Sequence, residues 1–218
     1  MMKKWFCSLG LWFMSLTGHT ATFQQNCVDR QIYIVHGYGA TIHDHWFESI
    51  QKQIQDQHTR VTILQLPHPM QPEVDAWQRV LEQNIKTIDE QTYFVAHSLG
   101  GITLLNFLSK QGNPKIGGII LVSGFTEVLP ALPQLDSYIL KSQNIQFNVQ
   151  NISHKHMFIS ENDQYVPPEL SVKLARELEI LYTLIPQAGH FLAEDGYIEF
   201  PQLIEYLKNV LRKEISPY

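Results

Sequence analysis

One serine of this 218-residue chain stands in a setting that is typical of a catalytic nucleophile. Ser98 lies within residues 95–101 (VAHSLGG), between an apolar run and a helical pattern. The small residues Ala96 and Gly100, two positions before and after the serine, permit the sharp strand-to-helix turn that exposes a nucleophile. A helix that starts at Leu99 would direct free N–H groups and its positive dipole end toward the serine. The alternative is a serine that only caps a helix.

A serine hydroxyl is a weak nucleophile at neutral pH, so it needs a histidine base that a carboxylate orients. Asp163 follows the apolar run at 156–159, and His190 follows the apolar run at 181–185. The carboxyl ends of parallel strands lie at one edge of a sheet, where open α/β sheets bind their ligands. We therefore predict that Ser98, Asp163 and His190 form a catalytic triad at that edge.

Other interpretations of the acid and the base stay open. Glu161 is a nearby competitor for the carboxylate role, and Asp195 is a weaker one because it follows the histidine in the chain. Asp163 could instead form an Asx turn before the next helix, and His190 could be an exposed loop residue. Three suitable residue types in the expected order favour the triad over these separate explanations.

A triad also requires two N–H donors for the negative oxygen that develops during attack. Leu99, the residue after the serine, is the expected first donor. The second should come from the glycine-containing loop at 36–40, with the Tyr38 N–H as first choice and that of Gly37 as second. Gly37 and His97 are also the candidate substrate contacts, with a hydrogen-bonded scaffold role as the alternative for His97.

Short apolar runs alternate with helical patterns along the rest of the chain. The runs are rich in β-branched residues and end at glycine, proline or polar loops, as buried strands do. The predicted strands are 31–36, 61–66, 92–96, 119–122, 156–159 and 181–185. The predicted helices begin at a capping box of Thr41 and Asp44, at Pro72 and after Ser98, and cover 135–141, 168–179 and 201–212.

This alternation predicts an α/β fold with one mainly parallel sheet of about six strands and helices on both faces. No linker or internal repeat interrupts residues 22–218, so we expect a single domain there. Residues 125–155 separate the fourth and fifth strands, which is enough for a small flap but not for a large cap.

The first 21 residues differ from the rest and have the layout of a secretory signal peptide. Lys3 and Lys4 precede an apolar run at 5–17, and small or polar residues follow it. The run is shorter than the roughly 20 residues that cross a bilayer, which favours a cleaved signal peptide over a membrane anchor. No stable membrane span is therefore expected after cleavage. We predict export to the periplasm or the medium, with a cytoplasmic or membrane-tethered protein as the alternative. Cleavage would leave Cys27 as the remaining cysteine, without an internal disulfide.

Composition and the remaining motifs argue against several partners. The formal charge of −5 and the lack of a Lys/Arg-rich run disfavour nucleic acid. The pairs His43/His45 and His154/His156 have no third and fourth ligand at zinc-site spacing, so no metal is assigned. No G-x-G-x-x-G follows a strand, so a dinucleotide has no support, and no cofactor is predicted.

Several motifs together resemble one known family. They are HGYG at 36–39 with HWF at 45–47, AHSLGG at 96–101, NDQYVP at 162–167 and GHF at 189–191. They are similar to motifs of the small serine hydrolases of the YdeN and retinoblastoma-binding-protein-nine family, over about residues 31–212. The resemblance implies an α/β-hydrolase fold with a minimal lid and a triad of Ser98, Asp163 and His190. The chain departs from the family in Ala96, which replaces the first glycine of the elbow, and in its N-terminal extension.

We therefore predict a serine hydrolase that cleaves small-molecule carboxylic esters through an acyl-enzyme. His190 would take the proton of Ser98, and Asp163 would hold the histidine in the required tautomer. An amidase or peptidase, an acyltransferase with the same triad, and a non-catalytic binding protein of the same fold are the alternatives. The sequence does not define an oligomeric state.

Overall fold

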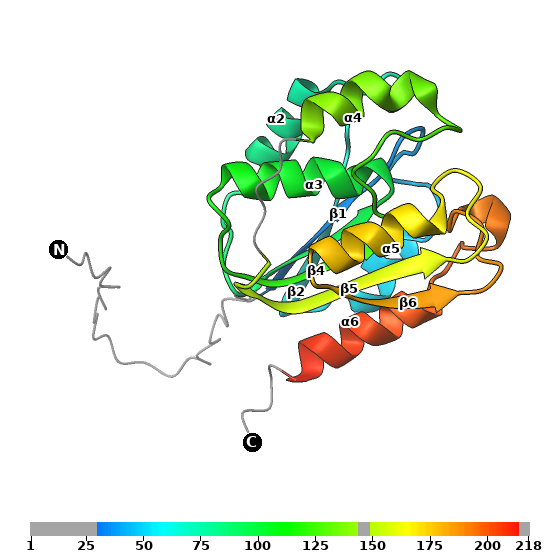
Figure 1. Ribbon diagram of the computed structural model, residues 1–218. Helices are drawn as coiled ribbons and strands as arrows, with labels where there is room; N and C mark the ends of the chain where they lie inside the picture. The colour runs from blue at the N-terminus through cyan, green and yellow to red at the C-terminus, as the bar shows by residue number, and fades with distance from the viewer. Residues whose placement is uncertain (1–29, 144–148, 214–218) are drawn as a thin grey trace, which may run out of the picture.

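A computed structural model describes residues 30–143 and 149–213, so the predicted leader at 1–21 and Cys27 lie outside the described residues. The described chain forms a six-stranded sheet in which every pair of neighbouring strands is parallel (Figure 1). The order across the sheet is β2-β1-β3-β4-β5-β6. The strands are β1 (Arg30–Val35), β2 (Thr59–Leu64), β3 (Thr92–His97), β4 (Ile116–Val122), β5 (Ile152–Ser160) and β6 (Leu181–Ile185).

Strand β3 lies near the middle of the sheet, between β1 and β4. Each of its residues is buried, because both faces of a parallel sheet are covered, and this explains the continuous apolar runs of the sequence. Since all strands run the same way, β3, β5 and β6 end at one edge. The loops that carry Ser98, Asp163 and His190 follow these strands there, as the sequence predicts.

Two layers of helices cover the sheet (Figure 1). Successive residues of β3 serve the two layers in turn: Phe94 packs in one apolar cluster and Tyr93 in the other. One face carries α2 (Val74–Asn84), α3 (Leu99–Lys110), α4 (Asp136–Ser142) and α5 (Pro168–Glu177), and the other carries α1 (Phe47–Ile54) and α6 (Pro201–Lys213). The predicted fold class is therefore confirmed.

The first helix begins later than predicted. The Asp44 carboxylate accepts hydrogen bonds from the Thr41 N–H (2.7 Å) and hydroxyl (2.8 Å), but these bonds close a turn that precedes the helix. His45 follows with a φ of 55°, a left-handed conformation that a right-handed helix does not contain. Helix α1 therefore starts at Phe47, and the predicted start at Thr41 was wrong.

The connection between β4 and β5 holds a short 3-10 turn (Pro133–Leu135) and helix α4, which packs against α2 and α3. The small flap predicted for residues 125–155 stays a prediction, since 144–148 lie outside the described residues. In residues 30–143 and 149–213, no helix is long and apolar enough to cross a membrane.

Candidate active site

The serine at the end of β3 has the backbone of a strained turn. Ser98 has a φ of 53° and a ψ of −125°, a region that non-glycine residues rarely occupy, and α3 begins at the next residue. Its N–H donates to the Val122 carbonyl at 2.9 Å, which ties the turn to the neighbouring strand β4. A Cβ on Gly100 would lie 2.3 Å from the Val35 carbonyl oxygen, so this position requires glycine.

Ala96, the departure from the family pattern, fits the elbow. It lies within β3 opposite Val35 of β1 and Leu121 of β4, and it is fully buried in the apolar cluster beneath α2 and α3. Its methyl group is therefore part of the core and does not disturb the turn two residues later.

Asp163 and His190 come together beside this turn. The Nδ1–H of His190 donates to the Asp163 Oδ2 at 2.7 Å, and both side chains are buried. The Ser123 hydroxyl donates to the same oxygen at 2.7 Å, while Oδ1 accepts the N–H groups of Tyr165 (3.0 Å) and Val166 (2.9 Å). Four donors around one carboxylate fix its direction. The proton on Nδ1 leaves the Nε2 of His190 with its lone pair.

Several side chains hold the loop that carries this histidine. The Nε2–H of His97 donates to the His190 carbonyl at 2.9 Å, and the indole N–H of Trp46 donates to the Phe191 carbonyl at 3.1 Å. The Asp195 Oδ2 accepts the backbone N–H groups of His190 (2.8 Å) and Leu192 (3.1 Å). Asp195 therefore supports the histidine loop, and the carboxylate that bonds the imidazole is Asp163.

His97 is itself fully enclosed. Burial, followed by the neighbouring His190 and His45, lowers the pKa of His97 well below its ordinary value of 6.5, so the ring is neutral. With its proton on Nε2, the ring can donate to the loop carbonyl without adding a charge to the site. Its predicted contact with substrate stays a prediction, whereas its bond to the His190 loop is direct.

The glycine-containing loop after β1 packs directly against the serine. A Cβ on Gly37 would lie 2.9 Å from the Ser98 Cβ, so the loop approaches closely because this residue has no side chain. His36 fixes the loop from below: its Nδ1–H donates to the Gly37 carbonyl at 3.0 Å and its Nε2 accepts the Leu66 N–H at 3.2 Å. The N–H groups of Tyr38 and Leu99 stay the predicted oxyanion donors.

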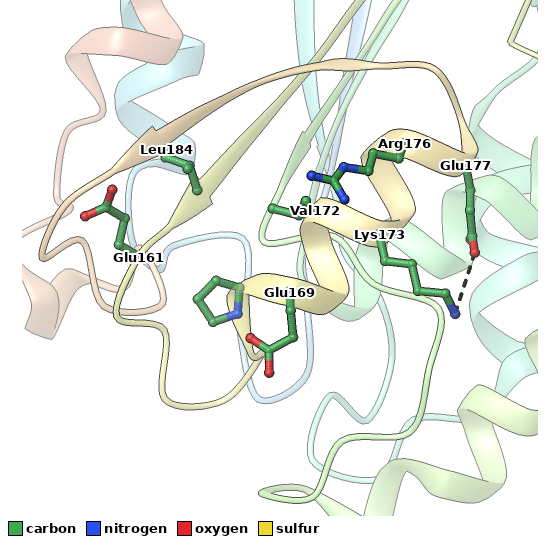
Figure 2. A pocket seen from close by; sticks show the side chains of 8 residues that line it. Glu161, Glu169, Val172, Lys173, Arg176, Glu177 and Leu184 are labelled. Atoms are coloured by element: carbon green, nitrogen blue, oxygen red, sulfur yellow. Dashed lines mark ion pairs between the residues drawn. The ribbon is translucent and has the colours of Figure 1, made fainter.

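Ser98 and His190 both line one cavity of about 220 Å³, whose other walls are Tyr38, Gly39, His45, Leu132, Tyr165 and Leu192. A larger groove of about 580 Å³ lies on the outer side of α5 and β6 (Figure 2). Glu161, the competitor for the carboxylate role, is exposed and lines this groove instead of bonding the histidine. The smaller cavity is thus the one that brings a nucleophile and a base together.

The histidine pairs that could suggest a metal have other partners. The Nδ1 of His43 lies 2.6 Å from a Glu48 carboxylate oxygen, and the Nδ1 of His45 accepts the Ala193 N–H at 3.0 Å. The Nε2 of His156 lies 2.9 Å from the Thr183 hydroxyl. In the described part of the chain, no group of three or more potential ligands could hold a metal ion.

Two residues that support the site were not predicted from the sequence. Ser123 follows β4 at the same edge as the three candidates, so its position after a strand was a usable signal. Trp46 entered the prediction only as part of the motif at 45–47, yet its indole N–H holds the histidine loop across 145 positions of sequence. Nothing in the local sequence marks that long-range bond.

A covered parallel sheet with a serine at a strained strand-to-helix turn and a histidine–carboxylate pair beside it defines the class of α/β hydrolases. The family model for serine hydrolases matches residues 32–209, and the chain belongs to this serine hydrolase family. YdeN of Bacillus subtilis (strain 168) is 36% identical over 186 residues, which cover 85% of this chain and 98% of YdeN.

Solved structures agree with this assignment. The crystal structure of the ydeN gene product from B. subtilis has a TM-score of 0.77 and 33% identity, and the match covers 84% of this chain and 99% of that one. Est1E from Butyrivibrio proteoclasticus with ferulic acid bound has a TM-score of 0.63 at 15% identity, over 88% of this chain and 91% of that one, which shows the fold alone. The family predicted from the motifs is thus confirmed.

Proposed function

We propose that this serine hydrolase cleaves carboxylic esters, with Ser98 as nucleophile, His190 as general base and Asp163 as the residue that orients the base. The observation that carries the proposal is the 2.7 Å bond between His190 Nδ1 and Asp163 Oδ2, in a cavity that Ser98 also lines. The histidine has its proton on Nδ1, so Nε2 is the nitrogen that takes the serine proton.

The reaction has two halves. His190 takes the proton of Ser98 as its oxygen attacks the ester carbonyl carbon, and the Leu99 and Tyr38 N–H groups stabilise the resulting oxyanion. The tetrahedral intermediate collapses, the C–O bond to the alcohol breaks, and His190 gives its proton to the departing alcohol. His190 then activates a water molecule, which attacks the acyl-enzyme and releases the acid and free Ser98.

Hydrolysis of matched substrates tests the bond preference. We expect kcat/KM for 4-nitrophenyl butyrate to exceed that for 4-nitrobutyranilide by at least about 10³-fold, since 4-nitrophenolate can leave unprotonated whereas the anilide nitrogen must be protonated. Comparable rates on the two substrates would instead support an amidase or peptidase. Transfer of the butyryl group to an added alcohol at the expense of hydrolysis would support an acyltransferase.

We also propose that the protein is exported after removal of residues 1–21, which supports action on substrates outside the cytoplasm. Mass spectrometry of the protein from its native cell tests this. A mature N-terminus close to residue 22 is expected, and a chain that retains Met1 would contradict export.

A further inference from the structure

A second groove shares one wall residue with the catalytic cavity. The groove has a volume of about 500 Å³ and lies along α1, so we call it the α1 groove. His45 is in the wall of both the α1 groove and the cavity of Ser98 and His190. His45 is thus the residue that the two spaces have in common.

His45 presents a defined hydrogen-bond donor at this boundary. Its left-handed backbone (φ 55°) places the ring so that Nδ1 accepts the Ala193 N–H at 3.0 Å. Edge contacts with the rings of Phe47 and His97, at centroid distances of 5.5 and 5.9 Å, fix the orientation further. Because Nδ1 is the acceptor, the ring proton is on Nε2, the edge opposite the Ala193 bond.

The two spaces differ in their chemistry. The cavity walls around Ser98 are mainly apolar or aromatic, from Tyr38, Leu132, Tyr165 and Leu192, and its volume of about 220 Å³ is below the roughly 300–1,000 Å³ of ordinary ligand pockets. Such a space suits a compact apolar group.

The α1 groove is instead rich in hydrogen-bonding side chains of both signs, from Glu48, Ser49, Lys52, Gln53 and Glu199, with Ile198 as its apolar part. His43, also in its wall, lies 2.6 Å from Glu48. Donors and acceptors interspersed in this way match hydroxyl groups, which both donate and accept, better than they match a ligand of one charge.

We propose that the preferred substrate is an ester of a compact apolar acid with a polyhydroxylated alcohol, and that the alcohol occupies the α1 groove with a hydroxyl accepting from the His45 Nε2–H. This inference rests on the proposed esterase function. The acyl group stays bonded to Ser98 and hence occupies the cavity, whereas the alcohol leaves with the proton from His190, so it belongs in the more open α1 groove. Water then adds to the acyl carbon and completes the hydrolysis.

The test compares two butyrate esters of similar length, the 6-butyrate of methyl glucoside and hexyl butyrate. We expect kcat/KM to be at least about tenfold higher for the glucoside ester. Ser49→Phe, which fills the α1 groove, should bring this ratio close to one. Glu169→Phe, which places the same ring in the groove at α5 and β6, is the matched control and should keep the ratio.

A second variant examines the donor at the boundary. His45→Asn keeps an acceptor for the Ala193 N–H and tolerates the left-handed backbone, but its shorter side chain does not reach as far as Nε2. We expect the same loss of preference, about tenfold, with the unfolding temperature close to that of the wild type. An unchanged preference in both variants, or an equal rate on the two esters in the wild type, would overturn the proposal.

Hydrolysis of 4-nitrophenyl butyrate separates this inference from the proposed function. Activity on it without preference for the glucoside ester overturns the substrate inference and leaves the esterase proposal standing. Inactivity of folded wild type on all three esters overturns both.

Discussion

Two concave regions of this molecule differ in size and in chemistry, and the smaller one contains the candidate catalytic groups. The groove at α5 and β6, which Figure 2 shows, has about 580 Å³ of space, and the cavity at Ser98 has about 220 Å³. In the larger groove, Lys173 pairs with Glu127 and, at 3.6 Å, with Glu177, and these side chains are a third or more exposed. The smaller cavity has a strained serine and a buried histidine held by an acid.

This difference shows that a cluster of side chains fixed by hydrogen bonds identifies a site better than the volume of a cavity does. Exposed ion pairs such as Lys173–Glu177 contribute little, because water screens them and the long side chains lose entropy when they are fixed. Around His190, in contrast, buried donors and acceptors each fix the position of the next group. Substitutions should therefore have large effects near the cavity and small ones in the larger groove.

The largest difference in kcat between the two regions should come from replacing one carboxylate in each. Asp163→Asn is expected to lower kcat on an ester about 10³- to 10⁴-fold, because an amide at this position no longer holds His190 in the tautomer with a free Nε2. Glu161→Gln, the matched change in the groove at α5 and β6, should lower kcat less than twofold. Steady-state kinetics of the two variants measures this, and equal losses would remove the distinction between the regions.

The strained turn should show the next largest effect, in stability. Gly100→Ala places a Cβ 2.3 Å from the Val35 carbonyl oxygen, and we expect it to lower the free energy of unfolding by about 3 kcal/mol or more. Gly101→Ala meets its nearest atom at an ordinary 3.5 Å and should be neutral or slightly stabilising. Urea unfolding of both variants provides the comparison, and a harmless Gly100→Ala would show that the turn is looser than described.

His97, which is buried behind the site, should make the stability of the protein depend on pH. The pKa of His97 in the folded protein lies well below 6.5, so as the pH falls the unfolded chain takes up this proton before the folded chain does. The contribution of neutral His97 to the free energy of unfolding is therefore present above pH 6.5 and is lost as the pH falls below it. The loss should approach about 1.4 kcal/mol per pH unit. His97→Gln, which keeps an N–H for the loop carbonyl but does not titrate, should weaken the dependence between pH 7 and 5. Parallel curves for wild type and variant would contradict this account.

A smaller effect is expected at Ser123. Ser123→Ala removes one donor from the Asp163 carboxylate and should lower kcat about tenfold with little change in KM, since the lost bond is worth about 1–2 kcal/mol and acts through the histidine. An unfolding curve close to that of the wild type would separate this positioning role from a loss of folding. A change confined to KM would assign Ser123 to substrate binding instead.

The smallest effect belongs to the larger groove. Arg176 is exposed and lines it together with Glu169 and Val172, without contact to the cavity at Ser98. Arg176→Ala should change kcat/KM on small esters less than twofold and the free energy of unfolding by less than about 0.5 kcal/mol. A loss of tenfold or more would show that this groove takes part in the reaction.

Much of this architecture could be predicted from the sequence. Continuous β-branched runs marked the buried strands, and the requirement for small residues around Ser98 marked the turn, because both follow from local sterics. Serine, acid and histidine after successive parallel strands also predicted which loops share an edge of the sheet. The order of residue types suits Glu161 as well as Asp163, so the choice of Asp163 rested on the resemblance of the motif at 162–167 until the bond to His190 was visible.

The rest depends on contacts that no local pattern records. The helix start at Phe47 was missed because His45 adopts a left-handed conformation that its long-range partner Ala193 helps to fix. The bond from Trp46 to Phe191 likewise joins distant segments. Such contacts depend on tertiary packing, which overrides local preferences for capping and helix formation.

Labelling with a fluorophosphonate probe tests the central claim most directly, since the probe reacts with a serine that a base has activated. We predict that the folded wild type is labelled and that Ser98→Ala and His190→Ala are not, while Arg176→Ala is labelled like the wild type. An unlabelled wild type with a native unfolding curve, or undiminished labelling of Ser98→Ala, would contradict the assignment of Ser98 as the nucleophile.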